Sequence, residues 1–137
     1  MKLYKTSNDK GISAESIYLK NGKSLEDVHK VEDKKTLISG IQYKKSAGFV
    51  EVFFNISSAN ITVSNGWTGL DYVTLPEGYR PASSIAKTAY CRKKDSVSTL
   101  IPINLYIQTN GNIRFVNLTG SEITFEYLID YIVFPVS

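Results

Sequence analysis

The feature that most constrains this chain is a series of short apolar runs that begins near Thr36 and continues to the C-terminal end. The runs are rich in β-branched and aromatic residues, and Gly, Asn, Ser and Pro interrupt them at intervals typical of β-sandwiches and barrels. Eight runs are enough for two packed sheets. The sequence predicts strands at residues 37–43, 48–56, 60–64, 69–75, 84–92, 97–108, 111–118 and 122–135.

Two local signals indicate how these runs connect. Asn110-Gly111 suits the positive φ angles of a tight turn, so strands 97–108 and 111–118 should pair as a hairpin. Segment 76–83 contains two prolines, which exclude a central strand and predict an extended loop. We therefore expect an all-β fold, an antiparallel jelly-roll-like β-sandwich, over residues 35–137.

The last run shows the clearest alternation of apolar and polar residues. Thr124, Glu126 and Asp130 are expected on one face of this strand, because successive side chains point to opposite faces. The other face is expected to carry the apolar set Ile123, Phe125, Tyr127, Ile129, Tyr131 and Val133. One face should therefore belong to the core, and the other should be wet or interfacial.

Residues 1–34 follow a different pattern and predict a short N-terminal stem. A short strand at 12–19 ends at an Asn-Gly turn, and Ser24 then has the character of a helix N-cap with acidic residues after it. A thin apolar stripe of Leu25, Val28 and Val31 follows on this helix. A helix this short is unstable alone, so the stripe should pack against copies of itself from sister chains.

Composition narrows the functional classes. At 137 residues, the chain has room for one domain and an appendage. The net charge is only +3, weaker than the clustered positive field of most nucleic-acid-binding domains. No stretch is apolar enough for a membrane span, and no targeting segment is expected.

The residues that usually carry catalysis are sparse. His29 is the only histidine and Cys91 the only cysteine, which argues against nucleophilic triads and most zinc sites. Glu126 and Asp130 lie about 13 Å apart along a strand, farther than the roughly 5–9.5 Å of glycosidase pairs. We therefore expect a protein without cofactor or metal that binds its target and is not an enzyme.

Two clusters could form a recognition surface. Trp67 lies between glycines and precedes Asp71 and Tyr72, offering the aromatic face and polar groups that bind sugars. The alternative is that Trp67 caps the core. Tyr90 and Arg92, followed by two lysines, could bind an anionic polymer, although an exposed hairpin end also explains this run.

Several phrases in the chain resemble those of a known family. Residues 12–30 (ISAESIYLKNGKSLEDVHK) contain an I-x-L-x-N-G-x-S-L-E-D phrase, and residues 75–91 (LPEGYRPASSIAKTAYC) begin with L-P-x-G-Y-R-P. Residues 104–117 (NLYIQTNGNIRFVN) contain I-x-x-x-G-x-I. Together these resemble the receptor-binding, or tail-fibre tip, proteins of tailed phages and prophages of Gram-positive bacteria.

The resemblance implies a homotrimer with a bundled N-terminal stem and a distal β-sandwich head. The head would bind a host cell-wall polysaccharide or teichoic acid, and the protein would be a virion component at the tail tip or baseplate, made in the bacterial cytoplasm. The long shaft of many fibres is absent, which leaves open a fragment of a longer fibre or a compact baseplate component.

Two alternatives to adhesion follow from the same sequence. The head could be a structural baseplate or fibre-assembly component that contacts only other virion proteins, in which case Trp67 and Tyr72 would be buried. The protein could also be a polysaccharide depolymerase, because clefts between subunits can assemble carboxylates that one chain does not bring together.

Overall fold

The computed structural model describes residues 30–136, and this part of the chain contains β-strands and no helix. Its nine strands are β1 (Lys35–Ile38), β2 (Ile41–Ser46), β3 (Phe49–Ile56), β4 (Ile61–Val63), β5 (Gly66–Thr74), β6 (Ile85–Lys93), β7 (Leu100–Ile107), β8 (Asn112–Asn117) and β9 (Ile123–Pro135).

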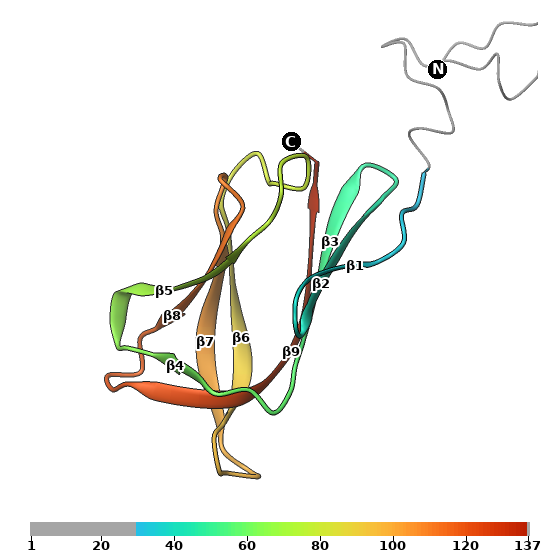
Figure 1. The fold of residues 1–137 in the computed structure, drawn as a ribbon. Coiled ribbons are helices and arrows are strands. Elements are labelled where there is room, and N and C mark those ends of the chain that lie inside the picture. The colour runs from blue at the N-terminus through green and yellow to red at the C-terminus, as the bar shows by residue number, and fades with distance from the viewer. Residues whose placement is uncertain (1–29, 137) are drawn as a thin grey trace, which may run out of the picture.

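The strands form one continuous antiparallel sheet in the order β1-β2-β3-β9-β6-β7-β8-β5, and β4 pairs with β9 outside this path. The C-terminal part of β9 pairs with β3, whereas its N-terminal part pairs with β4 and β6. The sheet is strongly curled (Figure 1), and its two end strands, β1 and β5, contact each other. The curl therefore creates an enclosed inner face and a solvent-facing outer face.

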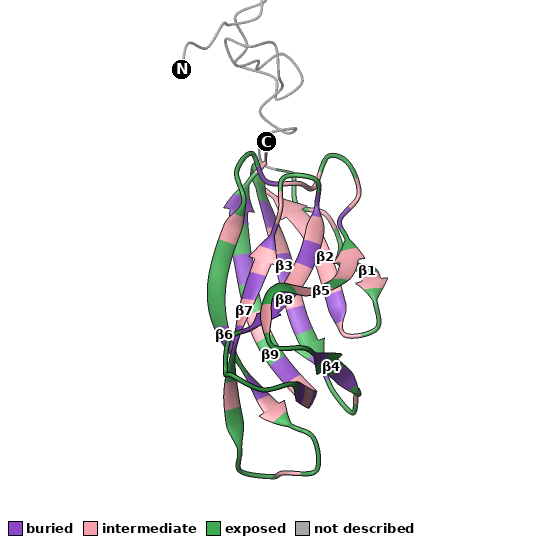
Figure 2. Ribbon diagram, turned by 90° about the vertical axis from the view of Figure 1, so that its left-hand side faces the viewer, coloured by how far each residue is buried: buried purple, intermediate pink, exposed green. Residues whose placement is uncertain are grey.

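The inner face holds the hydrophobic core. Figure 2 shows strands on which buried and exposed residues alternate, as expected for a sheet with one face in the core. The largest fully buried side chains include Phe54 on β3, Phe115 on β8 and Phe125 on β9. The Phe115 and Phe125 rings meet edge to face with centroids 5.6 Å apart. Side chains from both halves of the curled sheet thus pack into one core.

The predicted all-β antiparallel class is confirmed, while the jelly-roll connectivity stays a prediction. The predicted hairpin is also confirmed, because β7 and β8 pair with Ile107 opposite Ile113. In the turn between them Gly111 has a φ of +88°, and a Cβ there would lie 2.5 Å from the Leu75 carbonyl oxygen. Glycine is therefore required at this position by both conformation and space. The predicted 76–83 loop is confirmed between Thr74 and Ile85.

The prediction of a single strand at 37–43 is wrong, because two strands and a turn occupy this segment. β1 ends at Ile38 and β2 begins at Ile41, with a turn at Ser39 and Gly40. Gly40 has a φ of +86°, and a Cβ there would approach the Ile56 Cα to 3.0 Å. The apolar residues on both sides of the turn conceal it in the sequence.

The predicted alternation along β9 holds only in its first part. Ile123 and Phe125 are buried, but from Leu128 onward the buried residues are those of the opposite parity, including Ile132. The reason is a bulge in β9. Arg92 is the register partner of Tyr127 and Lys93 that of Phe125, which leaves Glu126 without a register partner on β6. One extra residue moves every later side chain to the other face.

The same shift exposes three side chains that the alternation assigned to the face of Ile123 and Phe125. Ile129 is 74% exposed, and Tyr131 and Val133 are also exposed. Together with Phe49 on β3 they form an apolar strip on the outer face, because Phe49 pairs with Pro135 at the end of the same strand. We call these four residues the β3–β9 strip.

The predicted stem falls mostly outside the described residues, including Leu25, Val28 and His29. Val31 is described, and its predicted helical placement is wrong: it forms an isolated antiparallel bridge with Ser46 and is 62% exposed. The backbone N–H of Glu32 donates to the Lys45 carbonyl 2.9 Å away. The extended segment at Val31 and Glu32 thus supplies hydrogen-bond partners to the backbone of β2.

Asn117, at the end of β8, is the one fully buried polar residue within residues 30–136. Its amide nitrogen donates to the carbonyl oxygens of Val63 (2.9 Å) and Ser121 (2.7 Å). Its amide oxygen accepts from the backbone N–H and the hydroxyl of Thr119. One side chain thus joins β8, β4 and the turn that leads into β9.

Asn117→Ala should lower the free energy of unfolding by about 3 kcal/mol, because it leaves buried donors and acceptors without partners. Asn60→Ala is the matched control, since Asn60 is exposed, and it should change this free energy by less than about 0.5 kcal/mol. Chemical denaturation of both variants measures the difference. Equal stability of the two variants would contradict the role assigned to Asn117.

Candidate functional site

The outer face of β6, β7, β8 and β5, which we call the platform, brings together the predicted recognition residues that face solvent. Strand register shows which side chains share this face, because directly opposed residues point to the same side. Tyr90 pairs with Pro102, and Asn104, two residues farther along β7, pairs with Val116. These positions alternate with core residues such as Ile103 and Leu105, which confirms that they point outward.

A shallow hollow of about 200 Å³ lies at the β5 end of the platform. Trp67 forms one side of it and is 70% exposed, so the alternative in which this residue caps the core is wrong. The other lining residues come from β7, β8 and the turn between them: Tyr106, Gln108, Arg114 and Val116. An exposed indole beside a phenol, an amide and a guanidinium offers both stacking and hydrogen bonding to a ligand.

The position of Trp67 depends on a local departure from regular strand pairing. The register of β5 against β8 is irregular between Gly66 and Leu70. Within this stretch Gly69 has a φ of +61°, and a Cβ there would lie 2.5 Å from the Phe115 carbonyl oxygen. Only glycine allows β5 to pass this close to β8. The two strands approach beside Val116, which lines the hollow together with Trp67.

Asp71 is placed beside the hollow by an ion pair with Arg114, its register partner on β8. The Arg114 Nε donates to Asp71 Oδ1 over 2.5 Å. Hydrogen bonds from Arg114 and from Asn112 hold the pKa of the Asp71 carboxyl below its ordinary value. The carboxylate is 57% exposed, so it stays ionised and able to accept hydrogen bonds from a ligand.

The other predicted residues do not join this hollow. Tyr72 points the opposite way from Asp71, and its ring packs on Phe115 with centroids 5.2 Å apart. Tyr90 is 61% exposed, but it lies on β6, at the other end of the strand order of the platform. Arg92 stacks on the Tyr127 ring at 3.6 Å and pairs with Glu126 at 3.2 Å, so contacts within the chain already occupy its guanidinium.

Four lining residues of the hollow were not expected from the sequence: Tyr106, Gln108, Arg114 and Val116. The signal that could have found the pair of Tyr106 and Arg114 is the hairpin turn. Gly111 N–H donates to the Gln108 carbonyl, and Gln108 N–H donates to Asn112, which places Tyr106 opposite Arg114. The contact with Trp67 has no such local signal.

The remaining candidates for chemistry are engaged in structural contacts. Burial raises the pKa of the Cys91 thiol to about 11, and the thiol lies 3.4 Å from the Ile101 carbonyl oxygen. The thiolate form is therefore scarce at neutral pH. Glu126 pairs with Arg92, and Asp130 pairs with Lys87.

Two other kinds of feature are absent from residues 30–136. In this range no three His, Cys, Asp or Glu side chains lie close enough to hold a metal ion. The same residues include no helix long and apolar enough to cross a membrane.

The curled all-β sheet is similar in fold to a phage receptor-binding head domain. A similar solved structure is the crystal structure of the head domain of phage bIL170, presented with the question whether the receptor-binding domains of lactococcal phages share a common fold. The TM-score is 0.59 at 15% sequence identity, and the match covers 79% of this chain and 98% of that domain. No known protein family and no curated protein matches the sequence. The likeness therefore lies in the fold.

Arg114→Gln should raise the pKa of Asp71 toward its ordinary value, because it removes the strongest hydrogen-bond donor to the carboxylate. Lys94→Gln, which removes a cation just beyond the far end of β6, is the control and should leave this pKa unchanged. NMR titration of the Asp71 carboxyl carbon measures both. An unchanged Asp71 pKa in Arg114→Gln would show that the ion pair does not control this group.

Proposed function

We propose that this chain carries the head of a phage receptor-binding protein, which adheres to a saccharide on the surface of a Gram-positive host without chemically changing it. The observation that carries the proposal is the exposed Trp67 beside the Asp71–Arg114 pair, on the outer face of a fold shared with a receptor-binding head domain. Cell-wall polysaccharide and teichoic acid are the candidate receptors.

The hollow has the groups that a sugar ring needs. The apolar face of a sugar can stack on the Trp67 indole, while its hydroxyls donate to the ionised Asp71 carboxylate. Arg114 donates to sugar oxygens with the N–H groups that Asp71 leaves available, and Gln108 can both donate and accept. Since Arg114 orients Asp71 before a ligand arrives, little ordering is needed on binding.

The pairing of carboxylates supports adhesion over depolymerase activity. Asp71, Glu126 and Asp130 each have a cationic partner in the same chain, namely Arg114, Arg92 and Lys87. The Asp71 carboxyl in particular has a lowered pKa because of Arg114 and Asn112, whereas a glycosidase also needs a carboxylic acid whose pKa is raised.

Trp67→Ala should weaken saccharide binding by about tenfold, because stacking on an aromatic ring contributes roughly 1–2 kcal/mol. Trp67→Phe keeps an aromatic face and should retain part of the affinity. Arrays of Gram-positive cell-wall polysaccharides and teichoic acids, probed with the purified full chain, measure the effect. Equal binding by wild type and Trp67→Ala would remove the hollow as the receptor site.

We also propose that the protein acts as a homotrimer at the tail tip or baseplate, with other tail proteins as its neighbours. Two features support contacts between copies. The predicted seam, now reduced to Leu25 and Val28, needs sister chains, and the β3–β9 strip exposes apolar side chains on the outer face. A surface of this kind favours contact with another protein chain.

Position and charge favour a second copy of this chain on the strip. The chain enters the head beside the β2–β3 turn, where the Ala47 N–H donates to the Lys30 carbonyl. Phe49 begins β3 at this same turn, so one end of the strip lies near Lys30, where the described part of the chain begins. Glu51, on the same face, is paired with Lys44 and accepts a hydrogen bond from Tyr131, which leaves the strip without an unpaired carboxylate to repel a copy.

Leu25→Asp combined with Val28→Asp should loosen the trimer, because charges replace the apolar seam. Ile129→Asp should weaken it further by placing a charge in the strip. Val97→Asp is the matched control, since Val97 is 91% exposed in the β6–β7 loop away from the strip. Light scattering reports the mass, and an unchanged mass in the triple variant would contradict the proposed contacts.

The rival function is that of a structural component that contacts only other virion proteins, and it predicts a different environment for Trp67. It requires Trp67 to be covered in the assembled particle, although Trp67 is exposed in the single chain. Trp67 is the only tryptophan of this chain, so the difference in fluorescence quenching between virions that carry the wild type and virions that carry Trp67→Phe isolates Trp67 and distinguishes the two functions. Quenching by a soluble agent supports adhesion, and protection supports the structural role.

A further inference from the structure

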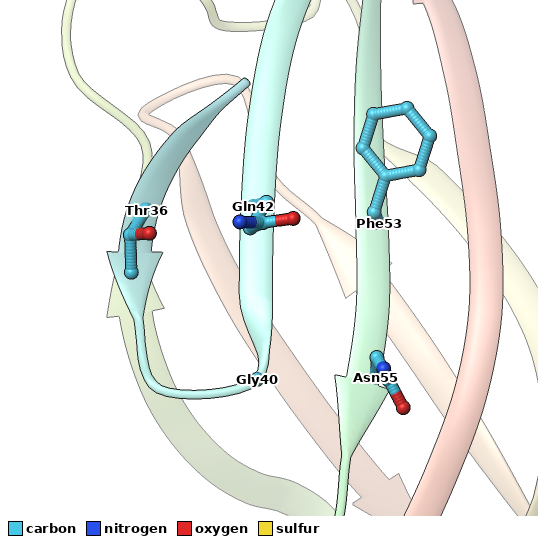
Figure 3. Close-up of a pocket in the computed structure, with 5 residues that line it drawn as sticks. All are labelled: Thr36, Gly40, Gln42, Phe53 and Asn55. Carbon is cyan, nitrogen blue, oxygen red and sulfur yellow. The ribbon is translucent and has the colours of Figure 1, made fainter.

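A second hollow, distinct from the one at Trp67, lies on the outer face of β1, β2 and β3. It has a volume of about 240 Å³ and is lined by Thr36, Gly40, Gln42, Phe53 and Asn55. Figure 3 shows Thr36, Gln42 and Phe53 on three neighbouring strands, with Asn55 farther along β3. Because β1–β3 and β6–β8 lie on different halves of the curled sheet, we call this hollow the β1–β3 groove to separate it from the platform.

Strand register places the side chains that line the groove next to one another. Thr36 pairs with Gln42, and Gln42 pairs with Phe53, so these three side chains lie side by side across the sheet. Asn55 follows Phe53 at the next outward position, and its backbone N–H donates to the Gly40 carbonyl over 2.7 Å. The hydroxyl, two amides and one phenyl ring therefore converge on one small area.

The turn between β1 and β2 keeps the groove open. Gly40 lies at the lower end of the groove in Figure 3, and it has no side chain to fill the space. A Cβ at this position would meet the Asn55 carbonyl oxygen at 3.1 Å, and the φ of +86° also disfavours other residues. The groove thus depends on the same glycine that divides β1 from β2.

The Phe53 ring is held in place by neighbours. The Lys34 Nζ lies 4.1 Å from its centroid, and the Tyr131 ring lies 5.2 Å away in a tilted arrangement. Such contacts fix the ring before a ligand arrives, which lowers the entropy lost on binding. The other polar groups are at least partly exposed, so a ligand can replace their water without breaking a buried network.

The chemistry of the lining indicates the class of ligand. All five lining residues are uncharged, and the nearby Lys34 ammonium lies over the Phe53 ring. Each amide of Gln42 and Asn55 can donate and accept at once, which matches adjacent hydroxyls that also do both. The phenyl ring suits the C–H face of the same molecule. We propose that the β1–β3 groove is a second saccharide subsite, which takes one neutral sugar or polyol unit of a surface glycan.

This inference rests on the proposed adhesion to saccharide and adds to it a second point of attachment. The groove and the Trp67 hollow lie on the outer faces of different halves of the sheet, with the core between the halves. The two hollows share no lining residue, so each head offers two places for a glycan unit. Two weak attachments in one head raise the overall affinity for a glycan-covered surface.

The test is an NMR titration of the full chain with glucose, galactose, rhamnose, N-acetylglucosamine, glycerol and ribitol, each added separately. The side-chain amide signals of Gln42 and Asn55 should shift with at least one of these ligands. In the double variant Gln42→Ala/Asn55→Ala, both amide contacts are lost. Titration of the backbone signals around Phe53 should therefore give an affinity for the sugar about tenfold lower than in the wild type.

Gln108→Ala is the matched control, since it removes the same type of amide from the Trp67 hollow and should leave the groove's affinity unchanged. Light scattering and the dispersion of the amide spectrum verify that each variant keeps its mass and fold. Shifts at Trp67 with none at Gln42 and Asn55 would overturn the groove and leave the proposed function standing. Shifts at the groove alone would support the groove and remove the Trp67 hollow as the receptor site, and a lack of response at both sites would overturn both.

Discussion

The bulge at Glu126 in β9 is the feature on which the rest of the structure depends. β9 pairs with β4 before the bulge and with β3 after it, and its pairing with β6 spans the bulge. One strand can belong to both halves of the sheet because a bulge increases local twist and bends the strand. Glu126 has no register partner on β6, but its side chain forms an ion pair with Arg92, whose guanidinium also stacks on the Tyr127 ring. The curl that encloses the core therefore depends on one additional residue in β9.

The same bulge determines what the molecule presents to its surroundings. It turns Ile129, Tyr131 and Val133 outward beside Phe49, producing an apolar strip that an uninterrupted strand would have hidden. The platform on the other half of the sheet instead carries polar and aromatic groups around Trp67. The outer faces of the two halves therefore differ in chemistry: one carries the apolar strip beside the β1–β3 groove, and the other carries the platform with the Trp67 hollow.

The likeness to the bIL170 head domain, at 15% identity, shows that this fold tolerates almost complete exchange of its side chains. In this chain the sheet depends on inward apolar residues and on glycines where strands turn or approach closely. Gly40, Gly69 and Gly111 each occupy such a place here, with positive φ and no room for a Cβ. Side chains on the outer faces are free of these limits, and recognition can change there without altering the sheet.

The sequence by itself determined the all-β class, the hairpin around Asn110-Gly111 and the loop at 76–83, because these follow from local turn chemistry and residue type. It also singled out Trp67 and Asp71, whose residue types and flanking glycines suggested a binding surface. It placed Tyr72 with them on proximity in the chain alone, and it assigned Arg92 to a second cluster with Tyr90. Tertiary contacts turn Tyr72 toward Phe115 and engage Arg92 with Glu126.

Only the tertiary structure decided the β9 face shift, the turn at Gly40 and the assembly of both hollows. A bulge arises from how two strands pair, so the sequence of one strand does not reveal it. The hollow at Trp67 joins residues far apart in the chain through the register of β5, β7 and β8. Local patterns specify which way a side chain points along its own strand, whereas pairing between strands determines its neighbours.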